Sequence, residues 1–339
     1  MKPSKKGIVA GGNWIIDQVK IVDFYPQEDE LAKILYQGTS NGGSPYNLLK
    51  NFARLGVSIK LSAAGLVGGD SNGKWIIDDC IKNGIDKKWL QVKKEAITSF
   101  TDVITSASSG RRTFFHQQGT CAQLSTEHFR LDKYKAGMFH LGYLLLLSKL
   151  DELDEKGRTE ASYLLEKAQN LGMKTSADVI SLLDADYQKV ATPSLPFINY
   201  FFLNDYEAAK LSGIEVKTNG EIDIEKLTSA AQKVLDMGVN NLVSVHFDKG
   251  ILLVEKDGKV WLQGKPIVPK EEHVGNAGVG EAVMTGILWA IHEGLDFEKG
   301  LELASAMAGC CMLDASCSNG ILPLEQTLEK AKEWKVHQF

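Results

Sequence analysis

The sequence has few cysteines, and their spacing gives no sign of a disulfide framework or a zinc site. Its 339 residues include 5 cysteines, an odd number without a CxxC pair: Cys80, Cys121, Cys310, Cys311 and Cys317. Structural disulfides need pairs of cysteines in an oxidising compartment, and zinc sites use closely spaced pairs. Neither is expected here, and a cytoplasmic location is the natural expectation.

The chain also lacks the features of nucleic-acid-binding and membrane proteins. It has 38 Lys and Arg against 43 Asp and Glu, so its formal net charge of -5 leaves no basic excess for nucleic acid. Its longest apolar stretches, residues 141–147 and 282–291, fall short of the roughly 18 residues that span a bilayer. The basic start, residues 1–6, precedes an apolar run that Gly11-Gly12-Asn13 interrupts, which indicates a first strand and not a signal peptide. We therefore expect a soluble intracellular protein that binds neither nucleic acid nor a membrane.

What the chain does have is an alternation of strand-length apolar runs with segments of helical periodicity. The hydrophobic fraction of 44% and the charged fraction of 24% are ordinary for a globular protein. Strands that alternate with helices of this length predict an α/β fold, with a mostly parallel sheet covered on both faces. No linker divides the sequence, so we expect one domain over residues 1–339. The expected elements are strands at 7–11, 58–66, 136–141, 174–178, 198–203 and 241–246, and helices at 45–55, 75–81, 159–171, 205–211 and 222–237.

One part of the sequence breaks this alternation. Residues 18–24, 32–36, 100–106 and 111–117 are typical of strands, yet no helix separates the members of each pair. They predict a small antiparallel sheet, drawn from about 18–38 and 100–117, that serves as a lid or as an oligomer contact. Its apolar residues would leave surface uncovered in a monomer, so a homodimer is expected; they are Val19, Ile21, Phe100, Phe114 and Phe115.

The clearest chemical motif is the glycine-rich turn Gly275-Asn276-Ala277-Gly278-Val279-Gly280-Glu281, which precedes an apolar helical segment. Such a turn presents free N–H groups and the positive end of the helix dipole, and together these bind a phosphate or stabilise developing negative charge. Glu281, in the first helical turn, is placed to accept a proton from a hydroxyl group. The alternative is a tightly packed turn in which Glu281 only complements the dipole.

A second glycine turn, Gly42-Gly43-Ser44-Pro45-Tyr46-Asn47, also precedes a helix. Its glycines allow a ligand to approach the backbone, and Pro45 suits the first helical turn. Asn13 and Asp17 follow the first strand, where open α/β sheets bind their ligands. An acceptor and a donor beside two glycines suit the recognition of a polyol. Asn13 and Asp17 are equally compatible with ordinary turn positions.

A third motif, Asn204-Asp205-Tyr206-Glu207, follows an apolar strand. It has the pattern of a helix capping box, with Asn204 as N-cap and Glu207 three residues later. The same side chains would suit a hydrated Mg²⁺ that accompanies a nucleotide, because Mg²⁺ keeps most of its waters. His246, like His116 and His140, lies in an apolar strand, where a buried structural histidine is the simpler interpretation. The sequence has neither a Walker GxxxxGK[ST] motif nor a strand–GxGxxG–helix fingerprint.

In this order, the motifs resemble the ribokinase/PfkB carbohydrate kinase family. The resemblance extends from about Gly7 to about Leu328. It rests on Asn13…Asp17, Gly42-Gly43…Asn47, Arg54-Leu55-Gly56, residues 65–70, Arg112-Thr113 with Gln118-Gly119, residues 204–207 and residues 278–282. It implies a three-layer α/β/α sandwich with a small β-sheet lid, and phosphorylation of a sugar or related polyol hydroxyl with ATP and Mg²⁺.

The resemblance also implies roles for individual residues. The sugar would bind Asn13, Asp17, Gly42, Gly43, Asn47 and Gln118. Asn204, Glu207, His246 and Asn276 would contact the nucleotide, with Glu207 also at the metal. The backbone of Gly278, Val279 and Gly280 would form the anion hole, and Glu281 would be the catalytic base.

Three positions depart from the family pattern. Glu281 replaces the usual aspartate, Gly275-Asn276 replaces an Asp-Thr pair, and Val245-His246-Phe247-Asp248 replaces a Thr-Leu-Gly-like segment. The extra methylene of Glu281 moves its carboxylate by roughly 1 Å, and a displacement of that size can cost about 100-fold in rate. The alternatives to a sugar kinase are therefore a relative that binds a sugar or nucleotide without turnover, and a nucleoside kinase.

Overall fold

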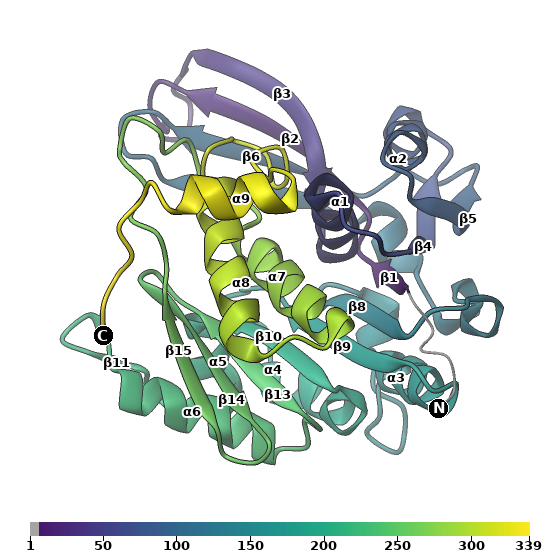
Figure 1. Ribbon diagram of the computed structural model, residues 1–339. Coiled ribbons are helices and arrows are strands. Elements are labelled where there is room, and N and C mark those ends of the chain that lie inside the picture. Colours follow the sequence, from purple (N-terminus) through teal and green to yellow (C-terminus); the bar gives the residue numbers. More distant parts are fainter. Residues whose placement is uncertain (1–6) are drawn as a thin grey trace.

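A large, mostly parallel sheet forms the middle of the molecule (Figure 1). The computed structural model describes residues 7–339, so the basic residues 1–6 of the sequence lie outside the description. Nine strands hydrogen-bond in the order β15-β14-β13-β10-β9-β8-β1-β4-β5. All pairings from β13 to β5 are parallel, and β14 and β15 are antiparallel additions at one edge. The strands are β1 (Ile8–Gly12), β4 (Leu61–Gly68), β5 (Asp86–Lys93), β8 (Met138–Leu144), β9 (Lys174–Val179), β10 (Tyr200–Asn204), β13 (Leu242–His246), β14 (Gly250–Glu255) and β15 (Val260–Gly264).

Helices cover both faces of this sheet, as the strand–helix alternation predicts. One face carries α1 (Ser44–Leu55), α2 (Ser71–Lys82), α7 (Val279–Glu293) and α8 (Phe297–Cys311). The opposite face carries α3 (Glu160–Asn170), α4 (Tyr187–Ala191), α5 (Asp205–Ser212) and α6 (Ile224–Asp236). In Figure 1 the yellow-green α7 and α8 lie in front of the sheet, and α9 (Leu324–Ala331) packs beside α8.

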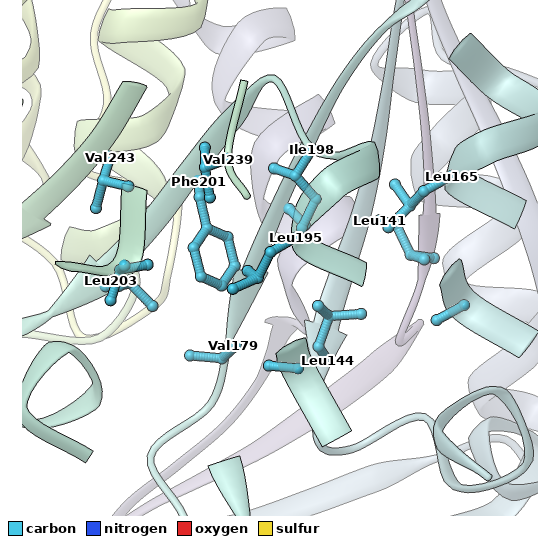
Figure 2. Close-up of a cluster of buried hydrophobic side chains, with 14 of the residues drawn as sticks. Leu141, Leu144, Leu165, Val179, Leu195, Ile198, Phe201, Leu203, Val239 and Val243 are labelled. Carbon is cyan, nitrogen blue, oxygen red and sulfur yellow. The ribbon is translucent and has the colours of Figure 1, made fainter. Parts of the chain in front are cut away.

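The sheet separates two hydrophobic cores, because successive side chains of a strand point to opposite faces. In β10, Phe201 and Leu203 enter the core under α3 to α6, whereas Tyr200 and Phe202 enter the core under α1, α2, α7 and α8. Figure 2 shows part of the first core, in which Phe201 lies among side chains from the neighbouring strands. Strands that are buried on both faces read as continuous apolar runs, which explains why the sequence revealed most of them.

A second, four-stranded sheet stands apart from the large one, at the upper left of Figure 1. We call it the lid; it consists of β3 (Ile34–Gly42), β2 (Ile15–Val22), β6 (Phe100–Ser106) and β7 (Arg112–Gln117), in that order. The four expected strand segments are confirmed. The outer pairs are antiparallel, as expected, but β2 and β6 pair in parallel and join them into one sheet.

The first lid strand begins earlier than the sequence suggests, at Ile15, and this places Asp17 in the lid. β1 ends at Gly12, and Asp17 lies within β2, opposite Ser40 of β3 and Thr101 of β6. Gly12 has a positive φ of 127°, and a Cβ there would collide with the carbonyl oxygen of Gly142 in β8. Only glycine fits this close approach, which brings the ends of β1 and β8 together.

The alternation does not predict β5, the edge strands β14 and β15, or the short hairpin of β11 (Lys217–Thr218) and β12 (Glu221–Ile222). Five short 3₁₀ helices complete the described elements: Gly119–Gln123, Thr126–His128, Leu131–Lys133, Ser148–Asp151 and Thr192–Phe197. Among residues 7–339, none of the helices has the length and hydropathy that a membrane-spanning segment needs.

Candidate functional site

A cavity of about 1490 Å³ lies between the lid and the carboxyl ends of the parallel strands. This volume exceeds that of a typical single-ligand pocket, so the cavity has room for two substrates. One face of the lid forms a wall of the cavity, because alternate residues of a strand share a face. These wall residues are Ile15, Asp17, Val19 and Ile21 of β2, Thr101, Val103 and Thr105 of β6, and Arg112, Phe114 and His116 of β7.

The glycine-rich turn forms the floor of the cavity at the start of α7. Gly278, the N-cap, has a φ of 78°, and a Cβ there would collide with the carbonyl of Cys317. The first intrahelical bond runs from the nitrogen of Ala282 to the oxygen of Gly278, at 2.9 Å. The amides of Val279, Gly280 and Glu281 therefore have no acceptor within the helix. They line the cavity, which is the geometry that an anion-binding helix start would need.

Glu281 is buried in this first turn, with a relative exposure of 8%. One carboxylate oxygen, Oε1, accepts hydrogen bonds from Nδ2 of Asn47 at 3.0 Å and from the hydroxyl of Tyr143. No hydrogen bond within residues 7–339 reaches the other oxygen, Oε2. Two donors from different elements thus fix the carboxylate, and one oxygen stays available to a ligand.

Asp17 lies on the lid wall, next to the second glycine turn. Its carboxyl group occupies the place where a Cβ of Gly42 would be, and its Oδ2 accepts a weak hydrogen bond from Sγ of Cys317 at 3.6 Å. Burial raises the pKa of Asp17 to about 7, and the nearby charge of Glu281 adds to this effect. The opposite charge of Arg112 lowers it only slightly. A carboxyl group with few partners is thus left facing the cavity.

Asn204 and Glu207 form the capping box that the sequence predicts at the start of α5. Oδ1 of Asn204 accepts from the nitrogen of Glu207, and Oε2 of Glu207 accepts from the nitrogen of Asn204, both at 2.8 Å. The other oxygen of Glu207 accepts from the hydroxyl of Ser181 at 2.8 Å. Burial raises the pKa of Glu207 to about 7. Both residues line the cavity, so the capping and ligand-binding interpretations are compatible.

Asp178 is a cavity residue that sequence reasoning missed. It lies near the end of β9 with a relative exposure of 7%, and its Oδ1 has no hydrogen-bond partner among the described residues. Burial and the charges of Glu281 and Glu207 hold its pKa well above the usual range. Its neighbour His140, at 3.6 Å, is neutral because burial lowers its pKa to about 3. Among residues 7–339, Asp178 therefore has no cationic partner.

The structure brings most of the predicted residues into one cavity but leaves three outside it. Asn13 is buried and structural: its Nδ2 donates to the carbonyl of Leu146, and its Oδ1 accepts from the nitrogen of Tyr143. Gly42 packs behind Asp17, and the exposed Gln118 begins a 3₁₀ helix. Neither lines the cavity. The predicted residues that do line it are Asp17, Gly43, Asn47, Asn204, Glu207, His246, Asn276, Gly278, Val279, Gly280 and Glu281.

His246 and Asn276 lie at the same end of the cavity as the glycine-rich turn. The ring of His246 packs against Gly280, where an added Cβ would lie 2.9 Å from Cε1. Burial and the charge of Lys265 lower the pKa of His246 to about 4, so the ring is neutral. Asn276 is exposed in the loop before α7, and its Oδ1 pairs with Nε2 of His273 at 2.9 Å.

Tyr143, Arg112 and Lys265 are further cavity residues to which the sequence analysis assigned no role. The position of Tyr143 and of Asp178 at the carboxyl ends of predicted parallel strands was the available signal, because ligands of open α/β sheets bind there. Arg112 was part of the Arg112-Thr113 motif, although no role was assigned to it, and Lys265 belonged to no motif. Arg112 belongs to the lid, and Lys265 follows a strand that the sequence pattern did not predict.

Comparison with known proteins gives consistent matches over nearly the whole chain. The model of the family "pfkB family carbohydrate kinase" matches residues 5–324. Two curated relatives named 5-dehydro-2-deoxygluconokinase are similar in sequence. The protein from Clostridium beijerinckii is 24% identical over 87% of this chain and 84% of its own length, and one from Clostridium perfringens is 26% identical over the same shares.

Solved structures match the fold. Ribokinase from Thermotoga maritima has a TM-score of 0.74 at 20% identity, covering 97% of this chain and 99% of its own. Arabidopsis thaliana ribokinase in complex with ribose and ATP has a TM-score of 0.73 at 20% identity, covering 96% of this chain and 99% of its own. The ribokinase-like fold, with its large sheet and smaller sheet, is thereby confirmed.

The raised pKa of Asp17 makes the stability of the protein depend on pH. The native state holds a proton up to about pH 7 that the unfolded chain loses near its ordinary pKa of 3.8. Stability therefore falls as the pH rises through this window and is constant above it. In the wild-type protein, Asp17 should lower the free energy of unfolding by roughly 2–3 kcal/mol between about pH 5 and about pH 8. The Asp17→Asn protein should not show this decrease. Urea unfolding of both proteins at these pH values measures the difference.

The exposed Asp184 provides a matched control, because Asp184→Asn removes the same charge from the surface. It should leave the pH dependence of the wild-type protein unchanged. Equal pH dependence in the Asp17→Asn and wild-type proteins would show that Asp17 titrates as an ordinary exposed carboxylate.

Proposed function

The chain belongs to the pfkB family of carbohydrate kinases, and we propose that it transfers a phosphoryl group from Mg²⁺-bound ATP to a hydroxyl group of a sugar or related polyol. The observation that carries this proposal is the arrangement around Glu281. A carboxylate fixed by two donors, with one free oxygen, lies in the first turn of a helix whose leading amides lack acceptors. A base and an anion-binding site side by side are what transfer to an alcohol needs.

In this proposal Oε2 of Glu281 accepts the proton of the attacking hydroxyl. The amides of Val279, Gly280 and Glu281 stabilise the charge on the transferred group, together with the helix dipole. Asn47 and Tyr143 orient the carboxylate without touching the reacting atoms. Phosphoryl transfer depends on positioning and electrostatics more than on covalent chemistry, so a glutamate base is compatible with turnover.

The residues present fit a magnesium ion. Asp178 and Glu207 are buried carboxylates with raised pKa values, and one oxygen of Asp178 has no partner. Within residues 7–339, no group of three or more His, Cys, Asp and Glu side chains could hold a metal by itself. This agrees with Mg²⁺, which is bound through one or two carboxylates together with substrate phosphates and water. Asp178 and Glu207 would hold the ion, which supplies charge neutralisation for the phosphates.

The substrate that we propose is an acidic sugar, for two reasons. The two relatives are named for a kinase of 5-dehydro-2-deoxygluconate, which carries a carboxylate. In this chain, Arg112 lines the cavity on the lid wall, close enough to affect the pKa of Asp17. No ion pair or hydrogen bond of its guanidinium group occurs in the described chain, and it lies only over the ring of Phe114. A free guanidinium group suits a carboxylate.

A homodimer through the lid remains part of the proposal. Leu35, Ile34 and Phe115 of the lid are 60%, 53% and 54% exposed. Some residues first expected on uncovered surface, such as Val19, line the cavity instead. The exposed apolar surface of β3 and β7 still favours cover by a second copy.

The role of Glu281 predicts the first kinetic result. Glu281→Gln should lower kcat about 100- to 10,000-fold, the usual contribution of a general base, and should leave the KM for the sugar nearly unchanged. Tyr143→Phe should lower kcat about tenfold, because the carboxylate is then held by Asn47 alone. Coupled assays with Mg²⁺-ATP and a panel of sugars, sugar acids and nucleosides measure both constants.

Glu293→Gln, at the exposed end of the same helix, serves as the matched control and should retain wild-type turnover. A Glu281→Gln variant within about threefold of wild type would exclude the base role. A wild-type protein that binds a sugar or nucleotide but transfers no phosphate would instead favour the non-catalytic alternative.

The role of Arg112 predicts a change in specificity. Arg112→Leu should raise the KM for a sugar acid such as 5-dehydro-2-deoxygluconate about 10- to 100-fold, the range expected for a lost charged hydrogen bond. The KM for neutral sugars should stay within about twofold. Arg111→Leu is the matched control, because Arg111 is exposed and does not line the cavity. An unchanged preference between acidic and neutral sugars would contradict this assignment.

The dimer proposal predicts a measurable mass. Light scattering at micromolar concentration should report two copies of the chain, and Leu35→Asp with Phe115→Asp should convert them to one. Leu183→Asp changes an even more exposed leucine outside the lid and should leave the dimer intact. A wild-type protein that is monomeric at this concentration would refute the dimer and leave the role of the lid in the cavity wall untouched.

A further inference from the structure

Lys265 is a buried charged residue that the proposed transfer does not use. It follows β15, has a relative exposure of 6% and lines the cavity. Its ammonium group makes no hydrogen bond or ion pair in the described part of the chain. Lysine is rarely buried without a partner, since the desolvation of its charge is costly. An unpaired ammonium group in a cavity wall therefore points to a ligand.

The backbone holds Lys265 in place on both sides. Its nitrogen donates to the carbonyl of Lys249 at 2.9 Å, and its carbonyl accepts from the nitrogen of His337 at 3.1 Å. The preceding residue, Gly264, lies so close to the carbonyl of His337 that a Cβ there would collide with it. The side chain thus begins at a fixed point of the backbone.

The charges around Lys265 do not neutralise it. Burial lowers its pKa, while Asp248 and Asp205 raise it, but neither carboxylate lies within ion-pair distance of the ammonium group. Asp205 instead pairs with Lys217 at 3.1 Å. The field of Lys265 also contributes to the low pKa of His246. The ammonium group therefore has no anionic partner among the described residues.

The surroundings of Lys265 indicate which anion would fit. Asp205 belongs to the Asn204–Glu207 capping segment, and His246, which lies within the field of Lys265, packs against Gly280 of the glycine-rich turn. Lys265 therefore belongs to the end of the cavity at which the proposed function places the phosphates. We propose that Lys265 binds a phosphate oxygen of the nucleotide donor; this inference rests on the proposed kinase function. A lysine acts at such a site as a point charge, without the fixed geometry of arginine.

A purely structural role predicts something different. If Lys265 only balances Asp248 and Asp205, its removal lowers stability and leaves nucleotide affinity unchanged. If Lys265 binds an anionic ligand, its substitution removes a buried charge that has no partner in the ligand-free protein. The variant should then be at least as stable as the wild type and should bind the nucleotide more weakly.

The test compares Lys265→Met with the wild-type full-length protein by calorimetric titration of ATP, ADP and adenosine in the presence of Mg²⁺. The Met variant should bind ATP and ADP about 10- to 100-fold more weakly, and its affinity for adenosine should change less than about twofold. Lys265→Arg should recover part of the loss, because it restores a cation. Lys249→Met, which removes an exposed lysine paired with Glu221, is the control for net charge.

Three results would overturn the inference. In the first, the Met variant binds ATP with wild-type affinity. In the second, its affinities for ATP and for adenosine fall by the same factor. In the third, its urea midpoint falls while the nucleotide affinity of its folded fraction is unchanged. Each of these leaves the kinase proposal standing. A wild-type protein that binds no nucleotide at all overturns the kinase proposal itself, so the two failures are distinguishable. Lys265→Gln provides the same comparison if the Met variant does not fold.

Discussion

The pair of hydrogen bonds that Glu281 accepts is the interaction on which the arrangement of the site depends. Asn47 belongs to α1, Tyr143 to β8 and Glu281 to α7, so one carboxylate oxygen joins a helix, a strand and a second helix. The network continues into the lid, because Nδ2 of Asn41 in β3 donates to Asn47 at 2.7 Å and to Ser318 at 2.9 Å. A satisfied buried network has one low-energy geometry. It fixes the carboxylate of Glu281 relative to the lid and to the glycine-rich turn.

A second constraint is the gathering of carboxyl groups in one desolvated cavity. Burial raises the pKa values of Asp17, Asp178 and Glu207, and the charge of Glu281 adds to each shift. Ionising all of these carboxyl groups together costs free energy, because they are desolvated and repel one another. A cation, or hydroxyl groups that donate hydrogen bonds to them, would lower this cost. Whatever binds the native cavity and not the unfolded chain also stabilises the fold. Ligand affinity and stability are therefore linked through the same carboxylates.

The sequence predicted the features that depend on local pattern. Parallel strands buried on both faces, the helix after Gly43 and the capping box at Asn204 each have a signal within a few residues, and all are present. Features set by distant contacts were missed. Asp17 lies in the lid because Gly12 ends β1 against Gly142, and Asn13 is turned inward toward Tyr143. Asp178 and Lys265 acquire their roles from burial beside other charges, which no local pattern records.

Two departures from the family pattern, Glu281 and His246, lie at the glycine-rich turn, and their contacts bear on whether the site is intact. The carboxylate of Glu281 meets the hydroxyl of Tyr143, and the ring of His246 packs against Gly280 within the field of Lys265. A decayed site loses partners among its buried polar groups, because nothing then selects against unpaired ones. Here Glu281 and Glu207 are well satisfied by protein donors. The ammonium group of Lys265 has no partner among the described residues and lines the cavity, whereas the unpaired Oδ1 of Asp178 is fully buried beside His140. Glu281 and Glu207 thus have protein partners, and the unpaired ammonium group of Lys265 lies where a ligand would bind. This pattern favours a site that still binds its substrates.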